Sequence, residues 1–152
     1  MANSVSQVLL TEAHLEAPKQ DVDPSTPLGT SLAVGAIVDF WGAVRELEDG
    51  REIEGIDYEA HRDMAEHQMK TIVEAAVETF RLNRVLLHHR IGFVRAGEAS
   101  LFLRVSAQHR AAAFAASQWI VDELKKKVPI WKRPRFENET QRGATQRAAA
   151  TV

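Results

Sequence analysis

The period of the hydrophobic residues changes along the chain, and the order of these changes restricts the fold. Between Arg62 and Phe80 the apolar residues recur at a spacing of about three to four positions, which predicts an amphipathic helix. Its buried face would consist of Ala65, Met69, Ile72, Val73, Ala76, Val77 and Phe80. This helix lies between segments of a different period.

A second, alanine-rich helix should begin near His109 or Arg110. We expect one of its stripes to contain Phe114, Val121 and Leu124. Pro129 should end this helix, because the residue before a proline is pushed toward an extended backbone. The segment "IWKRPRF" would therefore leave the helix as an extended chain.

The remaining ordered segments have the apolar runs or the two-residue alternation of strands. They are Ser4–Glu16, Leu32–Gly42, Glu52–His61, Arg84–Gly92 and Ala99–Gln108. The dipeptide Asp49-Gly50 is a turn signal in the charged loop before the third of them. Strands and helices do not alternate strictly, which predicts an α+β domain with a largely antiparallel sheet and two main helices.

The length of 152 residues fits one domain. Residues 1–31 would supply an N-terminal strand and loop to it, and residues 32–136 its main part. Residues 137–152 have almost no large apolar side chain, so we predict a flexible C-terminal tail.

Composition and charge exclude several classes of function. The chain has no cysteine, which rules out disulfides, thiolate metal sites and a cysteine nucleophile. It has neither a signal-peptide pattern nor an apolar run near the ~18 residues of a membrane helix, so we expect a cytoplasmic protein without a membrane segment. A net charge of −2 and the lack of a recognition motif argue against binding to nucleic acid.

Adjacent histidines at positions 88 and 89 suggest a metal site at first sight. Neighbouring residues of a strand point to opposite faces of the sheet, so His88 and His89 could not bind one ion together. No other ligands stand nearby at a suitable spacing, and the sequence therefore predicts no metal site.

The segment "KKKVPIWKRPRF" concentrates positive charge around Pro129. Lys126 and Lys127 would complement the dipole at the end of the second helix. Lys125 and Lys132 stand on either side of the bend and can face one concave spot. Spacing alone leaves two interpretations open: a catalytic pair of amines with altered basicity, or solvated surface charge.

Two further cationic positions stand where strands end. His109 and Arg110 come at the junction between a strand and a helix N-terminus, a place suited to a phosphate, although capping and surface charge would explain them as well. Arg45 follows an apolar strand directly, which is a natural position for binding an oxyanion.

Several motifs appear together in a fixed order between about Val34 and Arg133. They are "FWGAVR", "IDYEAHRDMAEHQM", "HHRIGFVRAGE" and "SAQHRAAAFAASQWIVDELKKKVPIWK". In these motifs the chain resembles the MoaE family, the large catalytic subunits of molybdopterin synthase. The resemblance implies an α/β hammerhead-type fold and makes residues 32–136 the catalytic domain.

The resemblance also implies an activity and partners. Members form a homodimer, and each copy holds a small ubiquitin-like sulfur-carrier subunit (MoaD-like) with a C-terminal Gly-Gly. The thiocarboxylate of this partner supplies sulfur, in two transfers, to cyclic pyranopterin monophosphate, with no permanently bound cofactor. The missing cysteines fit this chemistry, since the sulfur comes from the partner. A non-catalytic paralogue that acts as a scaffold for a ubiquitin-like partner is the alternative.

The matched motifs carry over the roles of site residues. Lys125 would be the principal catalytic amine, either a general acid/base or a transient covalent partner of the donor carbonyl. Lys132 would hold the thiocarboxylate and stabilise negative charge. Substrate-binding positions would be Phe40 in the tunnel, Ala43, Val44, Arg45, His109 and Arg110 around phosphate and pterin, and Arg133 and Pro134 at the rim. Pro134 stands where the family usually has an acidic residue, so any charge balance there is lost or moved.

The distance along the second helix adds a constraint. His109 and Lys125 are sixteen positions apart, about 24 Å along a straight helix, which is too far for one small-molecule site within a single subunit. In a two-fold dimer, His109 and Arg110 of one copy could reach the lysines of the other. We therefore expect an active site shared across a dimer interface.

Overall fold

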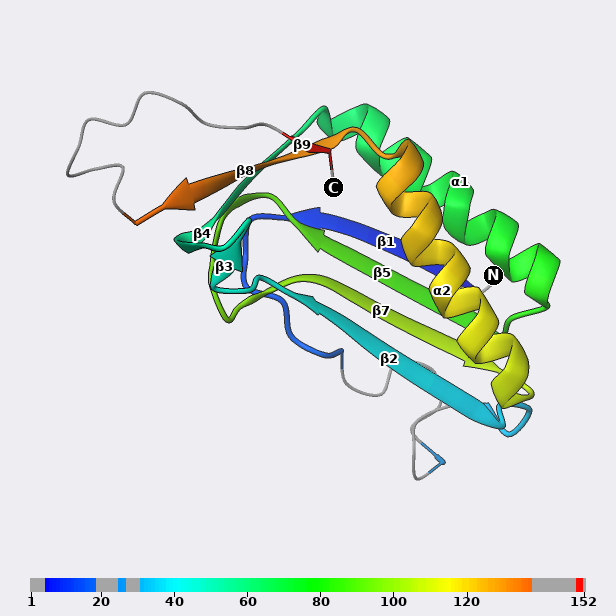
Figure 1. The fold of residues 1–152 in the computed structure, drawn as a ribbon. Coiled ribbons are helices and arrows are strands. Elements are labelled where there is room, and N and C mark those ends of the chain that lie inside the picture. Colours follow the sequence, from blue (N-terminus) through cyan, green and yellow to red (C-terminus); the bar gives the residue numbers. More distant parts are fainter. Residues whose placement is uncertain (1–4, 19–24, 27–30, 138–149, 152) are drawn as a thin grey trace.

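The computed structural model describes residues 5–18, 25–26, 31–137 and 150–151. Both helices lie on the same face of a four-stranded sheet, and a second sheet stands at one end of it (Figure 1). The elements are β1 (Ser6–Thr11), β2 (Ala36–Ala43), β3 (Leu47–Glu48), β4 (Arg51–Ala60), α1 (Arg62–Phe80), β5 (Arg84–Arg90), β6 (Gly92–Arg95), β7 (Ala99–Ala107), α2 (Arg110–Lys127), β8 (Ile130–Phe136) and β9 (Ala150–Thr151).

The larger sheet has the strand order β1-β5-β7-β2. The pair β1–β5 is parallel, whereas β5–β7 and β7–β2 are antiparallel. The hydrophobic core fills the space between this sheet and the two helices, with Phe102 and Leu86 buried on the opposite face of the sheet. The predicted α+β class, with a largely antiparallel sheet and two main helices, is confirmed.

The smaller sheet has the order β3-β4-β8-β9, and β6 also pairs with β4. The antiparallel register of β4 and β8 sets Tyr58 opposite Lys132. The short strand β9 pairs with Trp131 and Lys132 of β8. Apart from Glu137 and this strand, the tail for which we predicted flexibility lies outside the described residues.

The two helices have the bounds that the sequence predicts. The helix α1 begins after His61, whose Nδ1 accepts a hydrogen bond from the Met64 N–H at 3.3 Å. The helix α2 ends at Lys127, and Val128 before Pro129 has the extended angles φ −87° and ψ 128°. The proline therefore ends α2 as expected, and the following segment becomes β8.

The stripe that we expected to contain Phe114, Val121 and Leu124 is not the buried face of α2. The Phe114 side chain is 61% exposed. The buried face of α2 consists of Ala113, Ala116, Ser117, Ile120 and Leu124. Small residues on this face allow the helix to lie close to its neighbours, and Phe114 is turned by about 100° from Ala113.

The Asp49-Gly50 turn sets the position of β3 against β4. Asp49 has φ 52° and Gly50 has φ 76°, and these two consecutive positive values are typical of a type I′ hairpin turn. The turn signal in the sequence is confirmed, and the hairpin presents Glu48 beside β4 and β8.

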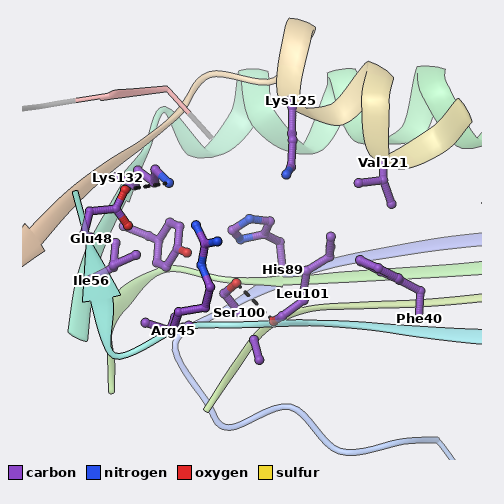
Figure 2. A pocket seen from close by; sticks show the side chains of 14 residues that line it. Phe40, Arg45, Glu48, Ile56, His89, Ser100, Leu101, Val121, Lys125 and Lys132 are labelled. Atoms are coloured by element: carbon purple, nitrogen blue, oxygen red, sulfur yellow. Dashed lines mark hydrogen bonds and ion pairs between the residues drawn. The ribbon is translucent and has the colours of Figure 1, made fainter. Parts of the chain in front are cut away.

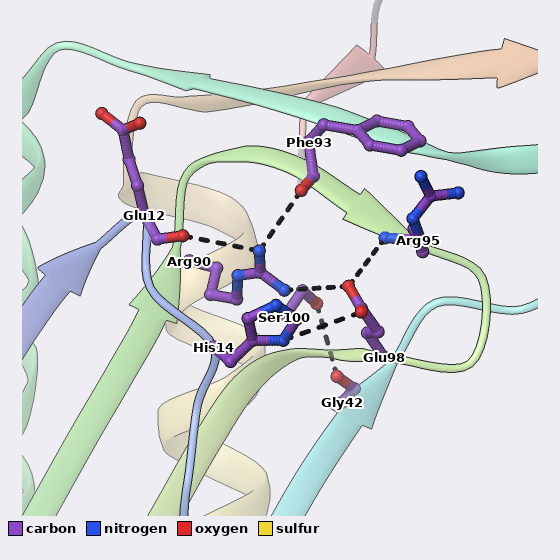
Figure 3. A network of polar contacts seen from close by, with 8 residues as sticks. All are labelled: Glu12, His14, Gly42, Arg90, Phe93, Arg95, Glu98 and Ser100. Atoms are coloured by element: carbon purple, nitrogen blue, oxygen red, sulfur yellow. Dashed lines mark hydrogen bonds and ion pairs between the residues drawn. The ribbon is translucent and has the colours of Figure 1, made fainter.

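A buried arginine ties the end of β5 to neighbouring segments (Figure 3). The Arg90 side chain is 6% exposed, and it donates to Glu98 Oε1 at 3.1 Å and to the Glu12 carbonyl at 3.4 Å. Glu98 also accepts from the Arg95 N–H at 3.1 Å. The hydrogen bond from the Arg95 backbone, together with Arg90, lowers the pKa of Glu98. These contacts fix the β5–β6 turn against the N-terminal segment.

Candidate active site

A cavity of about 300 Å³ lies where α2, the end of β2 and the smaller sheet meet (Figure 2). Both sheets and α2 contribute to its wall. The lining residues are Phe40, Gly42, Ala43, Val44, Arg45, Glu48, Ile56, Tyr58, His89, Ser100, Leu101, Val121, Lys125 and Lys132. Six of the ten positions that sequence reasoning assigned to the site are in this set: Phe40, Ala43, Val44, Arg45, Lys125 and Lys132.

The cavity receives one of the three lysines at the end of α2. Lys126 and Lys127 contact Glu123 at 3.8 Å and 2.7 Å on the helix surface. Lys125 instead points into the cavity toward His89, without an ion pair or hydrogen bond to another described residue (Figure 2). The distinction that the sequence suggested within the triplet is thus present in the structure.

Lys132 enters the same cavity from β8, after the chain has turned at Pro129. Its Nζ lies 3.8 Å from Glu48 Oε2, and the two side chains are 27% and 19% exposed. Glu48 contributes the acidic group among the lining residues. The carboxylate that balances Lys132 therefore comes from β3, and not from position 134.

The end of β2 supplies a third cation. The register between β2 and β7 shifts between Gly42 and Ala43, so the chain leaves the sheet at the edge of the cavity. Val44 is buried and its N–H donates to the Glu98 carbonyl at 2.9 Å. This anchoring leaves the exposed Arg45 at the mouth of the cavity.

Sequence reasoning missed the polar floor of the cavity. His89 is 1% exposed, and its Nδ1 lies 2.6 Å from the Arg90 carbonyl oxygen. Burial lowers the pKa of His89 to about 4, so the imidazole is neutral near pH 7. The sequence did contain a signal for this. His89 stands at an even spacing from Val85 and Leu87 in the same strand, so its polar side chain points to the same inward face as these apolar residues.

Tyr58 and Ser100 complete this floor. The Tyr58 ring meets the His89 ring edge-on, with 5.3 Å between ring centroids. Burial raises the pKa of Tyr58, although the Ser100 hydroxyl acts in the opposite direction, so the phenol keeps its proton. The floor is uncharged, whereas Arg45, Lys125 and Lys132 place positive charge around it. Such a cavity can hold an anionic group above a neutral, hydrogen-bonding part of a ligand.

Four expected site residues do not line this cavity. His109 and Arg110 are exposed at the far end of α2, and His109 makes no side-chain capping bond. Arg133 points away from Lys132 and contacts Glu59 at 3.2 Å, because alternate residues of β8 face opposite sides. Pro134 is buried one strand repeat further along, opposite Ile56. Their binding roles stay predictions.

His88 and His89 point to opposite sides of the sheet, as expected. His88 contacts the Phe102 ring, with 5.9 Å between centroids, while His89 lines the cavity. Within residues 5–18, 25–26, 31–137 and 150–151, no group of at least three His, Cys, Asp or Glu side chains is placed to hold a metal ion. Neither described helix combines the length and the apolar character needed to cross a membrane.

The fold and the cavity define an α+β protein with a pocket that is lined by the cationic side chains Arg45, Lys125 and Lys132. The chain belongs to the MoaE protein family, whose model matches residues 15–127. A molybdopterin synthase catalytic subunit of Pyrococcus abyssi is 42% identical over 113 residues, covering 74% of this chain and 76% of the relative. The resemblance found in the motifs is confirmed.

Solved structures share the fold. Molybdopterin synthase from Staphylococcus aureus superposes with a TM-score of 0.71 at 28% identity, covering 81% of this chain and 85% of that chain. A protein–protein complex of subunits 1 and 2 of molybdopterin-converting factor from Helicobacter pylori gives a TM-score of 0.61 at 22% identity, covering 78% and 73%. At that identity the second likeness shows the fold alone.

Proposed function

We propose that this chain is the catalytic subunit of a molybdopterin synthase, a sulfur transferase of molybdenum cofactor biosynthesis. It would take sulfur from the C-terminal thiocarboxylate of a small ubiquitin-like subunit and transfer it to cyclic pyranopterin monophosphate. The observation that carries the proposal is the convergence of Lys125 and Lys132 on one cavity from either side of Pro129. Membership of the MoaE family supports it.

The cavity suits the charges that this reaction develops. The thiocarboxylate is an anion, and the Lys132 ammonium offers it a partner in place of Glu48. During transfer the sulfur of the donor bonds to a carbon of the pterin substrate, and a carbon–oxygen bond of that carbon breaks, so that its oxygen leaves as water or stays on the phosphate as the cyclic ester opens. The carbon–sulfur bond of the donor then breaks and the sulfur stays on the substrate. The acyl carbon then passes to water, or first to the Lys125 amine and then to water, so the partner leaves as a carboxylate. Two transfers complete the dithiolene.

Lys125 is suited to act on the acyl carbon of the donor, as a proton-transfer group or as a nucleophile. Its amine points into the cavity and is not engaged by Glu123, which contacts the next two lysines. An amine without a carboxylate partner is available for proton transfer or for attack on an acyl carbon. Either role would use the same orientation of Lys125.

The partner's tail would enter past Phe40 and Arg45 at the mouth. Phe40 is 39% exposed although it lines the cavity, so its ring stands at the edge of the entrance. A Gly-Gly end has no side chains and could pass such an aromatic ring as an extended chain. The Helicobacter pylori structure of two subunits together is consistent with this kind of partner.

A second copy of the chain would complete the site. His109 and Arg110 stand at the N-terminus of α2, about 24 Å along the helix from Lys125. Their exposed side chains make no hydrogen bond or ion pair with the rest of the described chain. In a two-fold homodimer they would supply the phosphate-binding end of the neighbouring cavity.

Reconstitution tests the function. Purified chain, thiocarboxylated small subunit and cyclic pyranopterin monophosphate are mixed, and formation of the dithiolene product is followed by mass spectrometry. We expect two sulfur atoms in each product molecule and none when the small subunit ends in an ordinary carboxylate. If the chain binds the small subunit but forms no product, the scaffold alternative holds and the proposal is refuted.

A further inference from the structure

We propose that the floor of the cavity is a neutral hydrogen-bonding subsite in which His89 Nε2 accepts a hydrogen bond from an N–H group of the substrate's heterocycle. This inference rests on the proposed function and adds to it the residue that recognises the uncharged part of the substrate. His89 would be a binding residue for the ring system, while the surrounding cations bind anionic groups.

The hydrogen bond at Nδ1 fixes the tautomer of His89. A carbonyl oxygen can only accept a hydrogen bond, so the 2.6 Å contact with the Arg90 carbonyl requires the proton on Nδ1. Because burial keeps the ring neutral, Nε2 then carries a lone pair and no proton. The imidazole therefore presents an acceptor, and not a donor, to any ligand that reaches it.

The acceptor nitrogen is available to a ligand. His89 is 1% exposed, yet its ring is part of the cavity wall. Among the described residues, none hydrogen-bonds to Nε2. Nε2 is not among the fully buried side-chain atoms that lack a partner, so it opens to the cavity, where a ligand can donate to it. An unpartnered polar atom of a buried side chain at a cavity wall indicates a ligand contact.

The distribution of charge selects the heterocycle over the partner's tail. Lys125 is exposed, and Lys132 and Arg45 also lie nearer the solvent than the floor, where His89, Tyr58 and Ser100 are buried. A tail that enters end-first carries its anion at its tip. A neutral acceptor at the floor would not stabilise that anion, so the tip should stop among the cations. A heterocycle that carries a phosphate matches both regions, because its phosphate suits the cations and its uncharged ring suits the neutral floor.

Nitrogen NMR of the wild-type chain tests the subsite directly. The imidazole rings are labelled with ¹⁵N, and the His89 signals are assigned by comparison with His89→Gln. The free chain should show a protonated Nδ1 and an unprotonated Nε2. Addition of cyclic pyranopterin monophosphate should shift the Nε2 signal toward that of a hydrogen-bonded acceptor, with the proton still on Nδ1. Inorganic phosphate alone should leave Nε2 unchanged.

Two outcomes of this titration overturn the subsite. One is an unchanged Nε2 signal when calorimetry shows that the pterin substrate is bound. The other is a shift caused by the Gly-Gly tail peptide of the small subunit but not by the substrate. If calorimetry detects no binding of the substrate at all, the proposed function fails as well, so failure of the subsite alone is distinguishable from failure of both.

Kinetics of paired variants provide a second test. In His89→Asn the amide can still donate near the Nδ1 position but no acceptor reaches the Nε2 position, so KM for the pterin substrate should rise about ten-fold with little change in kcat. His89→Gln places an oxygen near Nε2 and should raise KM clearly less. His88→Gln, on the opposite face of the same strand, is the matched control and should leave KM unchanged.

The affinity for the small subunit separates this role from a general structural defect. If His89 only supports the fold, both variants should lower the melting temperature and weaken binding of the small subunit and the pterin substrate alike. A rise in KM of the same size for both His89 variants, or an equal loss of affinity for the small subunit, would contradict the subsite.

Discussion

At the residue scale, burial decides the chemistry of the cavity floor. His89 is held neutral by its surroundings, and its proton is fixed on Nδ1 by the Arg90 carbonyl. Tyr58 is likewise kept in its neutral, protonated form by burial. The cations Lys125 and Lys132 reach the same cavity from the rim. In the proposed reaction, a charged rim above a neutral floor would let one small cavity bind an anion and a heterocycle at once.

The low pKa of His89 predicts acid sensitivity of the fold. The unfolded chain takes up a proton near the ordinary pKa of 6.5, whereas folded His89 does so only near pH 4. The stabilisation is therefore complete above about pH 6.5 and lost as the pH falls to about 4, a change of roughly 3 kcal/mol. Urea unfolding at several pH values measures it.

The control for this prediction is His89→Gln, in which the loss between pH 6.5 and 4 should be smaller. Part of the loss should remain, because burial, followed by the charge of Arg104, also lowers the pKa of His88. Equal pH dependence in wild type and His89→Gln would show that His89 does not titrate as described.

At the element scale, the ends of strands and helices place the functional groups. Pro129 ends α2 and sends the chain back as β8, which brings Lys132 into the cavity beside Lys125. The Asp49-Gly50 turn presents Glu48 to Lys132. The buried Arg90 holds the end of β5, directly after His89, against the N-terminal segment.

The Arg90 contacts predict a stability effect. Replacing Arg90 by Met keeps most of the buried length but removes the charge-assisted hydrogen bonds to Glu98 and to the Glu12 carbonyl. We expect a loss of about 3 kcal/mol in the free energy of unfolding, measured by urea denaturation. Arg95→Met, at an exposed arginine at the end of β6, is the control, and its effect should be much smaller. An equal loss in the free energy of unfolding in both variants would contradict a stabilising role of the buried hydrogen bonds of Arg90.

The sequence was informative wherever a local rule determines geometry. Hydrophobic period predicted α1, Pro129 predicted the end of α2, and the dipeptide Asp49-Gly50 predicted a turn. The cavity floor could not be predicted in this way, because His89, Tyr58 and Ser100 come from three strands whose pairing is a long-range property. The exposure of Phe114 could not be predicted for a related reason, because the spacing of apolar residues along a helix does not determine which face of the helix will pack on the sheet.

At the scale of the whole molecule, one chain holds two separated sets of cationic residues. Lys125 and Lys132 line the cavity, while His109 and Arg110 lie at the other end of α2. If the chain forms a two-fold dimer, His109 and Arg110 of one copy can lie at the cavity of the other copy, beside its Lys125 and Lys132. The homodimer is thus part of the proposed catalytic unit, since neither end of α2 would suffice by itself.

Mixing of inactive variants tests this sharing. Lys125→Ala and the double variant His109→Ala/Arg110→Ala should each be nearly inactive alone. After subunit exchange at equal amounts, half of the dimers should be mixed and have one intact site of two, so about a quarter of the wild-type activity should return. Native mass spectrometry confirms the exchange. No recovered activity in confirmed mixed dimers would contradict a shared site.

The central claim is that the Lys125 amine acts in sulfur transfer, and its neighbour Lys126 provides the closest control. Lys126 has the same charge in the same helical turn but contacts Glu123 at the surface. Single-turnover formation of the dithiolene should slow by about 100-fold or more in Lys125→Ala, because a positioned proton donor or nucleophile is lost. Lys126→Ala should retain the wild-type rate. Wild-type turnover by Lys125→Ala, with the small subunit still bound, would contradict the account.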